Sequence, residues 1–137
     1  MSSFGKDVAN LVKKYEKRIR ATAKEAVQET VAGAQTPQGR GGRMPIVTGF
    51  LRGSIVGAVG SMPSGQTQPA SDRPTVAGDG IAAALLRWNP ERGETLYVGW
   101  SAVYARAMEY RYGFMRGAAD KWPATVDRVA RKVRARI

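Results

Sequence analysis

The chain has 137 residues, of which 43% are apolar and 24% charged, and these values are typical of one globular domain. It has no Cys and no His, which excludes a disulfide framework, a Cys/His zinc site, a thiolate nucleophile and a Ser-His-Asp triad. Its 22 Lys and Arg residues outnumber 11 Asp and Glu residues, so the net charge of +11 favours polyanions or acidic protein surfaces as partners.

The N-terminal segment shows no signal for export or membrane insertion. Residues 1–20 alternate apolar and charged side chains and lack the continuous apolar core of a signal peptide. No apolar run in the sequence approaches the ~20 residues that span a bilayer. We therefore expect a soluble protein made in the cytoplasm.

A long amphipathic helix is predicted from Phe4 to about Ala32. Its apolar residues recur every three or four positions, which places them on one stripe of a helix. Ser2 or Ser3 can cap its start, and Gly33 can end it. Such a helix is a rod of roughly 43 Å, much longer than the radius of the domain that must cover it. We expect it to pack along a sheet for part of its length and to project, or meet a neighbouring subunit, for the rest.

The middle of the chain predicts loops and a small sheet. Residues 33–45 and 60–80 are rich in Gly, Pro and polar side chains and predict long loops, which tend to be functional or mobile. Strands are expected at residues 51–59, 81–88 and 95–100, with a hairpin connection between the last two. The simplest arrangement of these strands is an antiparallel meander.

Two helices are predicted after the last strand. Ser101 can cap the first, which ends at Gly113. The second begins near Asp120 and has Pro123 in its first turn, where the missing N–H costs nothing. The expected fold class is α+β: a long N-terminal helix on an antiparallel sheet of three or four strands, with two C-terminal helices, in one domain over residues 1–137.

Positive charge is concentrated at the two ends of the chain. Residues 1–32 carry seven basic and four acidic side chains, and residues 114–137 carry seven basic and two acidic ones. These charges suit either phosphate backbones or an acidic partner subunit, and the second is favoured because the helices lack the interleaved aromatic residues of single-strand binders. The single RGG-like unit at residues 40–43 is better explained as a flexible basic loop. The candidate interface residues are Arg40, Arg43, Arg73, Arg128, Arg131, Lys132 and Arg134, and the last four are expected on the outward face of the final helix.

The carboxylates show no catalytic or metal-binding pattern. Those of the first helix are expected to pair with basic residues of the same helix, one turn away. They are Glu16, Glu25 and Glu29, and their expected partners are Lys13, Arg20 and Lys24. The carboxylates of the predicted loops do not show the spacing of metal ligands. They are Asp72, Asp79, Glu91 and Glu94. We expect no catalytic residue, no metal, no cofactor and no enzyme activity.

Glu109 falls within an aromatic helical segment. A buried or interfacial carboxylate there would need a partner, such as Arg106, Arg111 or a tyrosine hydroxyl. A structural hydrogen bond is favoured over a catalytic role for this side chain.

Three stretches resemble a family of small tail-component proteins of long-tailed phages, variously called tail-completion, neck or head–tail joining proteins. Residues 45–55, PIVTGFLRGSI, resemble its Pro-Val-x-Thr-Gly-x-Leu-Arg-x-Ser-Ile signature. Residues 97–113, YVGWSAVYARAMEYRYG, resemble its later hydrophobic-Gly and Tyr-Ala-x-x-x-Glu-x-Gly stretch, and residues 114–137 resemble its closing Phe-Leu-Arg-x-Ala and basic helix. The motif positions are Thr48, Gly49, Leu51, Arg52, Ser54, Ile55, Tyr104, Ala105, Glu109, Gly113 and Phe114.

These motif residues also have a physical interpretation. Thr48 can cap a helical turn and Gly49 permits a tight bend, after which Leu51 anchors the next segment in the core. Tyr104, Ala105 and Glu109 are expected on one helix face, with Ile55 in the core and Phe114 and Met115 locking the junction to the last helix.

The resemblance implies a structural virion protein that assembles into a ring, commonly six-fold, between the tail tube and the head connector. Its partners would be copies of itself and neighbouring neck, connector and tail-tube proteins, with DNA passing through the lumen, no small-molecule substrate and no membrane. It would be made in the host cytoplasm and end up in the virion. A small basic nucleic-acid-binding protein using its C-terminal helix is the main alternative. A tail-terminator ring is another, and a nuclease or toxin would need a catalytic role for Glu109 or Asp79.

Overall fold

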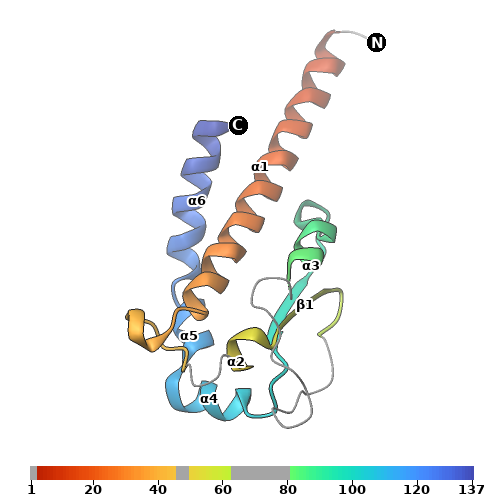
Figure 1. The fold of residues 1–137 in the computed structure, drawn as a ribbon. Helices are drawn as coiled ribbons and strands as arrows, with labels where there is room; N and C mark the ends of the chain where they lie inside the picture. Colours follow the sequence, from red (N-terminus) through yellow and green to blue (C-terminus); the bar gives the residue numbers. More distant parts are fainter. Residues whose placement is uncertain (1–2, 46–49, 63–80) are drawn as a thin grey trace.

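A computed structural model describes residues 3–45, 50–62 and 81–137. Over these residues the protein combines helices with a small antiparallel sheet, which confirms the mixed helix-and-strand class. Figure 1 shows α1 and α6 side by side above a body of short helices and strands. The elements are α1 (Ser3–Ala34), η1 (Gln38–Arg40), α2 (Phe50–Gly53), β1 (Ile55–Val59), α3 (Ala82–Arg87), η2 (Pro90–Arg92), β2 (Leu96–Trp100), α4 (Ala105–Tyr112), α5 (Phe114–Ala119) and α6 (Trp122–Arg136).

The long N-terminal helix is confirmed. α1 has 32 residues and includes Gly33, so it ends slightly later than expected. α6 lies antiparallel beside its C-terminal half, and the N-terminal part of α1 extends well past the end of α6 (Figure 1). The close approach of the two helices depends on Ala26, whose small side chain is fully buried against Val129 and Val133.

The sheet is smaller than the sequence predicts. In the described ranges it has two strands, β1 and β2, which pair antiparallel with Ile55 opposite Trp100 and Val59 opposite Leu96. The first half of the expected strand at residues 51–59 is the short helix α2 instead. Residues 63–80, which contain most of the expected second loop, lie outside the described residues.

The expected strand at residues 81–88 is wrong, because this segment is the helix α3. Its run of Ala and Leu residues has high helix propensity. Ala84 and Leu85 are buried, whereas Leu86 is 82% exposed, so the segment buries one helical face. The expected hairpin after it is also wrong, since the connection to β2 contains the 3-10 turn η2.

The C-terminal part follows the expected order with one addition. α4 ends at Gly113, which has a φ of 67° and takes the left-handed conformation that glycine favours. Ser101 is not its cap, because the Ser101 hydroxyl donates to the Ser54 carbonyl at 3.1 Å and Tyr104 occupies the position before α4. α5 was not expected, and α6 has Pro123 in its first turn as predicted.

Trp100 joins the two main parts of the core. It packs against the cluster around Leu51 and Phe114 and against the cluster around Ile55 and Trp88. Its indole N–H donates to Gln35 Oε1 at 2.8 Å, and its ring meets Phe114 edge-on at 5.0 Å. The end of α1 is therefore fixed to the sheet, whereas its start has no such connection. Each helix in the described ranges is too short or too polar to cross a bilayer.

Candidate assembly surface

The N-terminal half of α1 carries an apolar stripe that remains in solvent. We call it the α1 stripe; its side chains are 45% to 76% exposed, and they are Phe4, Val8, Leu11, Val12, Tyr15 and Ile19. Their spacing of three and four residues keeps them on one side of the helix. Together they expose on the order of 500 Å² of mainly apolar surface, as large as the biggest patch on a typical monomer. Patches of this size are often functional.

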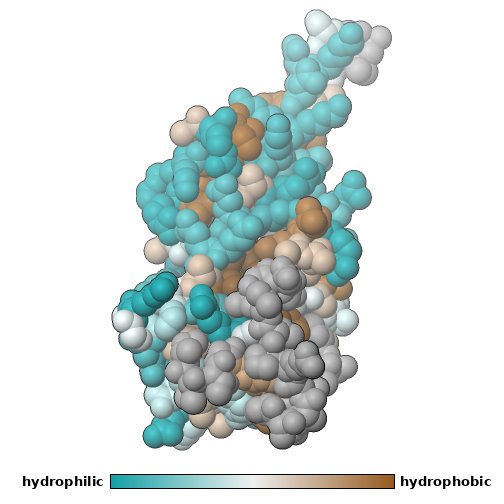
Figure 2. Space-filling model, viewed as in Figure 1, coloured by the Kyte–Doolittle hydropathy of each residue, from teal (hydrophilic) through white to brown (hydrophobic). Residues whose placement is uncertain are grey.

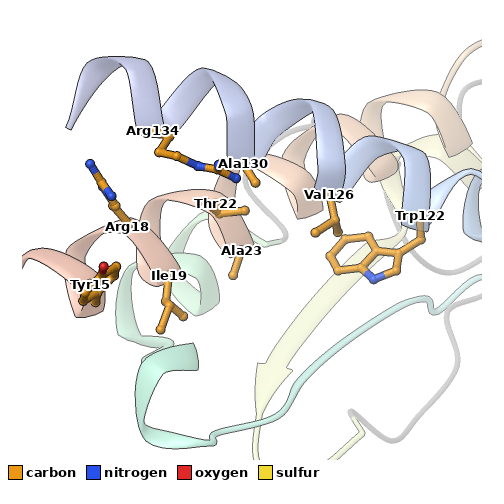
Figure 3. Close-up of a pocket in the computed structure, with 9 residues that line it drawn as sticks. All are labelled: Tyr15, Arg18, Ile19, Thr22, Ala23, Trp122, Val126, Ala130 and Arg134. Atoms are coloured by element: carbon orange, nitrogen blue, oxygen red, sulfur yellow. The ribbon is translucent and has the colours of Figure 1, made fainter. Parts of the chain in front are cut away.

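The α1 stripe leads into a hollow between α1 and α6, which we call the α1–α6 groove. Tyr15 and Ile19 belong to both. The groove has a volume of about 630 Å³ (Figure 3). Its α1 side is formed by Tyr15, Arg18, Ile19, Thr22 and Ala23, and its α6 side by Trp122, Val126, Ala130 and Arg134.

Trp122 extends this apolar surface toward the sheet. Its side chain is 38% exposed, and it also lines a second hollow of about 410 Å³. Val27 and Val31 of α1 lie on one side of that hollow, and Leu96 and Val98 of β2 on the other. The stripe and the two hollows therefore form one apolar path from the start of α1 to the edge of the sheet. Figure 2 shows apolar atoms between hydrophilic ones over the part of the molecule where α1 and α6 lie.

Two ion pairs hold α6 beside α1 along the edge away from Trp122. Arg128 donates to both carboxylate oxygens of Glu29, at 3.2 and 2.6 Å, and Arg136 donates to Glu25 at 2.7 Å. The hydrogen bonds from Arg128 lower the pKa of Glu29, and the same contact raises the pKa of Arg128. These partly exposed pairs add to the packing of Ala26 against Val129 and Val133, which brings the two helices together.

The expected ion pairs within the first helix are therefore wrong for Glu25 and Glu29, whose partners come from α6. Arg20 also pairs outside α1, with Glu91 of η2 at 2.7 Å, and this contact lowers the pKa of Glu91. Lys24 donates to the carbonyl of Leu86 at 3.4 Å. Partners from distant elements replace the local ones because folding brings α3, η2 and α6 against the sides of α1.

The prediction that the basic residues of the last helix form its outward face is confirmed only in part. Arg128 turns toward α1 to bind Glu29, and Arg134 lines the α1–α6 groove. Arg131 and Lys132 are exposed, as predicted.

The two described arginines of the predicted loops, Arg40 and Arg43, do not line the α1–α6 groove. Arg40 is exposed at the end of η1. Arg43 Nη1 donates to the Gly113 carbonyl at 3.5 Å, so it contacts the start of α5 rather than the groove. Arg73 lies outside the described residues.

The family-like motif residues gather in the core rather than at the groove. Leu51 and Phe114 are buried together, and Tyr104 and Ala105 pack against them. Burial raises the pKa of the Tyr104 hydroxyl. Ile55 belongs to the adjoining cluster. The remaining described positions form short polar contacts: the Ser54 hydroxyl donates to the Leu51 carbonyl at 2.7 Å, and the Arg52 carbonyl accepts from Gln35 Nε2 at 2.9 Å. Thr48 and Gly49 lie outside the described residues.

Glu109 forms a structural hydrogen bond, as favoured, but its partners differ from the expected ones. Its carboxylate accepts from the backbone N–H groups of Met115 at 2.6 Å and Arg116 at 3.2 Å. These groups belong to the first turn of α5, so Glu109 acts as a cap from the preceding helix. The turn at Gly113 brings the carboxylate back over that end. Met115 itself is 38% exposed, so Phe114 alone of this pair is buried in the junction.

The groove could not be located from the sequence, although one signal pointed to it. The predicted rod of residues 4–32 is roughly 43 Å long, much longer than the radius of the domain, so part of it has no obvious cover. Trp122, Val126 and Ala130 lie four residues apart along one side of α6, and this side forms the groove. Within the part of the chain that the structure describes, no three His, Cys, Asp or Glu residues are grouped to hold a metal ion.

Comparison with known proteins gives no match: no family model fits the chain, and no curated protein and no solved structure matches it.

Proposed function

We propose that the chain is a structural virion protein of a tailed phage or phage-like particle. It forms an oligomeric ring at the head–tail junction, in the tail-completion or neck position, and joins the tail to the head connector. The observation that carries this proposal is the α1 stripe, an amphipathic half-helix that extends past its own domain with its apolar side in solvent. Burying such a surface stabilises association at about 25 cal/mol per Å² before the costs of binding are subtracted.

The packing of the motif residues supports the same proposal. The stretches at residues 45–55 and 97–114 resemble a tail-component family, and the described parts of both meet in one core around Leu51 and Phe114. Their backbones are also joined, since the N–H of Ser101 donates to the Ser54 carbonyl at 2.9 Å. Segments that are distant in sequence thus form one packing unit, as a shared fold would require.

Contacts between subunits of the ring and contacts with neighbouring proteins are assigned to four parts of the chain. These are the loop at residues 33–45, the segment at residues 60–80, and the exposed sides of the first and last helices. No catalytic role is proposed for any residue, and the partners are further copies of the chain, neighbouring neck and tail proteins, and DNA in the lumen.

A small basic DNA-binding protein is the alternative, because Arg131 and Lys132 of α6 are exposed on the surface, where they could contact phosphates. The alternative is weaker, since Arg128 and Arg136 are engaged with carboxylates of α1. It also leaves the α1 stripe unexplained, because phosphate contacts need no apolar surface.

Sedimentation velocity distinguishes the two functions. The purified chain is measured alone and after mixing with tails assembled without it, and its affinity for a DNA duplex is measured at 50 and 200 mM salt. We expect a multi-subunit species, bound to tails, with ring-shaped particles in negative stain. A chain that stays monomeric beside tails and binds duplex DNA tightly, with an affinity that falls steeply with salt, would contradict the proposal.

A further inference from the structure

We propose that the α1 stripe and the α1–α6 groove together bind an amphipathic helix of another protein, one with acidic residues beside its apolar face. This inference rests on the proposed function in one respect: the bound helix belongs to a neighbouring protein in the same phage particle. It assigns this surface to the joint between different proteins and leaves the ring contacts between copies to other surfaces.

The shape of the surface fits a helix. From Phe4 to Ile19 the stripe is about 22 Å long, and Tyr15 and Ile19 carry it into the groove, where α6 forms a side wall. Trp122 lies at the far end of the groove from Arg18 and Arg134 (Figure 3). An apolar channel with one open side is the form in which proteins bind amphipathic helices.

The positive charge of this surface favours an acidic ligand. Residues 3–20 carry six basic and two acidic side chains, and residues 122–136 carry five basic and one acidic. Arg18 and Arg134 lie at the same end of the groove, from opposite walls. The Arg18 guanidinium lies 5.9 Å from the centre of the Tyr15 ring. A carboxylate from a bound helix would accept hydrogen bonds from the guanidinium groups of Arg18 and Arg134, and such bonds are stronger than those between neutral groups.

A second copy of the chain fits this surface poorly. Pairing two α1 helices through their stripes would bring Lys14 and Arg18 of one copy near the same basic groups of the other, and like charges in contact are unfavourable. The two carboxylates in this part of α1, Asp7 and Glu16, are outnumbered by six basic side chains, and Glu25, Glu29 and Glu91 bind arginines of their own chain.

Peptide binding tests the proposal on the full chain. Three fluorescein-labelled helical peptides are compared by fluorescence anisotropy at 150 mM salt: one with a leucine face flanked by Glu, the same peptide with Lys in place of Glu, and a scrambled acidic peptide with no apolar face. We expect the first to bind at least tenfold more tightly than the other two.

Substitutions locate the binding site. The pair Leu11→Glu and Ile19→Glu should weaken binding of the acidic amphipathic peptide at least tenfold, and the pair Arg18→Gln and Arg134→Gln about fivefold or more. Leu86→Glu and Arg106→Gln are the matched controls, because both residues are exposed on other elements. The four positions altered in the binding site and the two control positions all lie on the surface. Far-UV circular dichroism should therefore show the same helix content in all these variants.

Several results would overturn the proposal. They are equal binding of the three peptides, loss of binding in the control variants, or no binding at all. Dissociation of an oligomer by Leu11→Glu and Ile19→Glu, without peptide binding, would assign the stripe to a second copy. Binding of phosphatidylglycerol vesicles through the stripe, without peptide binding, would assign it to a membrane surface. A ring at the head–tail junction with no peptide binding would refute this inference alone, and peptide binding by a protein absent from the junction would refute the proposed function alone.

Discussion

Glu109 shows how one side chain can join two helices. It lies in the last turn of α4, yet its carboxylate accepts both hydrogen bonds from the first turn of α5. This position lets α5 start directly after Gly113, without a polar capping residue of its own. The acidic position of the family-like motif therefore has a structural task that needs no catalytic chemistry.

Replacing Glu109 by Ala should lower the free energy of unfolding by about 1–2 kcal/mol, because two N–H groups of α5 lose their acceptor. Glu109→Gln retains one oxygen and should cost less. The control is Glu16→Ala on the exposed part of α1, which should change stability by about 0.5 kcal/mol at most. Urea unfolding followed by circular dichroism measures all three. Equal stability of the Ala variant and the unmodified chain would show that the cap is unimportant.

At the scale of elements, α1 has two halves with different roles. Ala26 in the C-terminal half is fully buried under Val129 and Val133, whereas Ala9 in the N-terminal half is exposed. Ala26→Leu should therefore push α6 away and cost about 1–3 kcal/mol of unfolding free energy. Ala9→Leu introduces the same side chain and should change stability by about 0.5 kcal/mol or less. Thermal or urea unfolding checks the pair, and similar losses in both variants would contradict the assignment of a free N-terminal half.

Ion pairs between elements make stability depend on pH. Arg128 lowers the pKa of Glu29 and Arg20 lowers that of Glu91, each below the ordinary value of 4.5. Near pH 4 the unfolded chain therefore binds more protons at these groups than the folded chain does. The contribution of these two ion pairs to the free energy of unfolding is complete above about pH 5. It is lost as the pH falls through the lowered pKa values.

Unfolding measured between pH 6 and pH 3 should show this loss in the unmodified chain. It should be smaller in the double variant Glu29→Gln and Glu91→Gln, because those groups no longer titrate. Asn10→Ala, at an exposed position of α1 without a titratable group, is the control and should leave the dependence of stability on pH unchanged. If the unfolding free energy of the double variant depends on pH as steeply as that of the unmodified chain, these pairs do not couple folding to proton binding.

The helices of the two ends were predictable because their patterns repeat over many turns. Residues 4–32 and the last helix each carry their apolar residues on one side, and a period of three to four residues over such a length indicates a helix. The segment at residues 81–88 is too short for periodicity to distinguish a buried strand from a helix. Its Ala-Ala-Ala-Leu-Leu composition was the better indicator, and it favours a helix.

The candidate surface was predictable in outline only. The predicted length of the first helix indicated an uncovered part, whereas the acidic partners that the net charge favours stay a prediction. The side of α6 that forms the groove was not predictable, since it depends on which arginines reach across to α1. Arg128 and Arg134 have the same charge and lie on the same helix, yet one binds Glu29 and the other lines the groove. Which arginine reaches α1 depends on contacts between segments that are distant in sequence. The local sequence does not determine those contacts.

At the scale of the whole molecule, the protein is a small body with a long helix that extends beyond it (Figure 1). The body holds the sheet and the family-like motif residues, and the helix presents the α1 stripe. A single copy leaves this stripe in water, which is unfavourable for a free monomer and useful for a component of an assembly. The net charge of +11 suits acidic neighbouring proteins, with DNA in a lumen as a further contact.

Electron microscopy of phage or phage-like particles from cells that make this chain tests the central claim most directly. An epitope tag at the C-terminus, labelled with gold-conjugated antibody, marks the position of the protein in intact particles. The account predicts gold at the junction of head and tail, and separated heads and tails when the gene is deleted. Gold along the tail shaft, or particles that assemble fully and contain none of the protein, would contradict it.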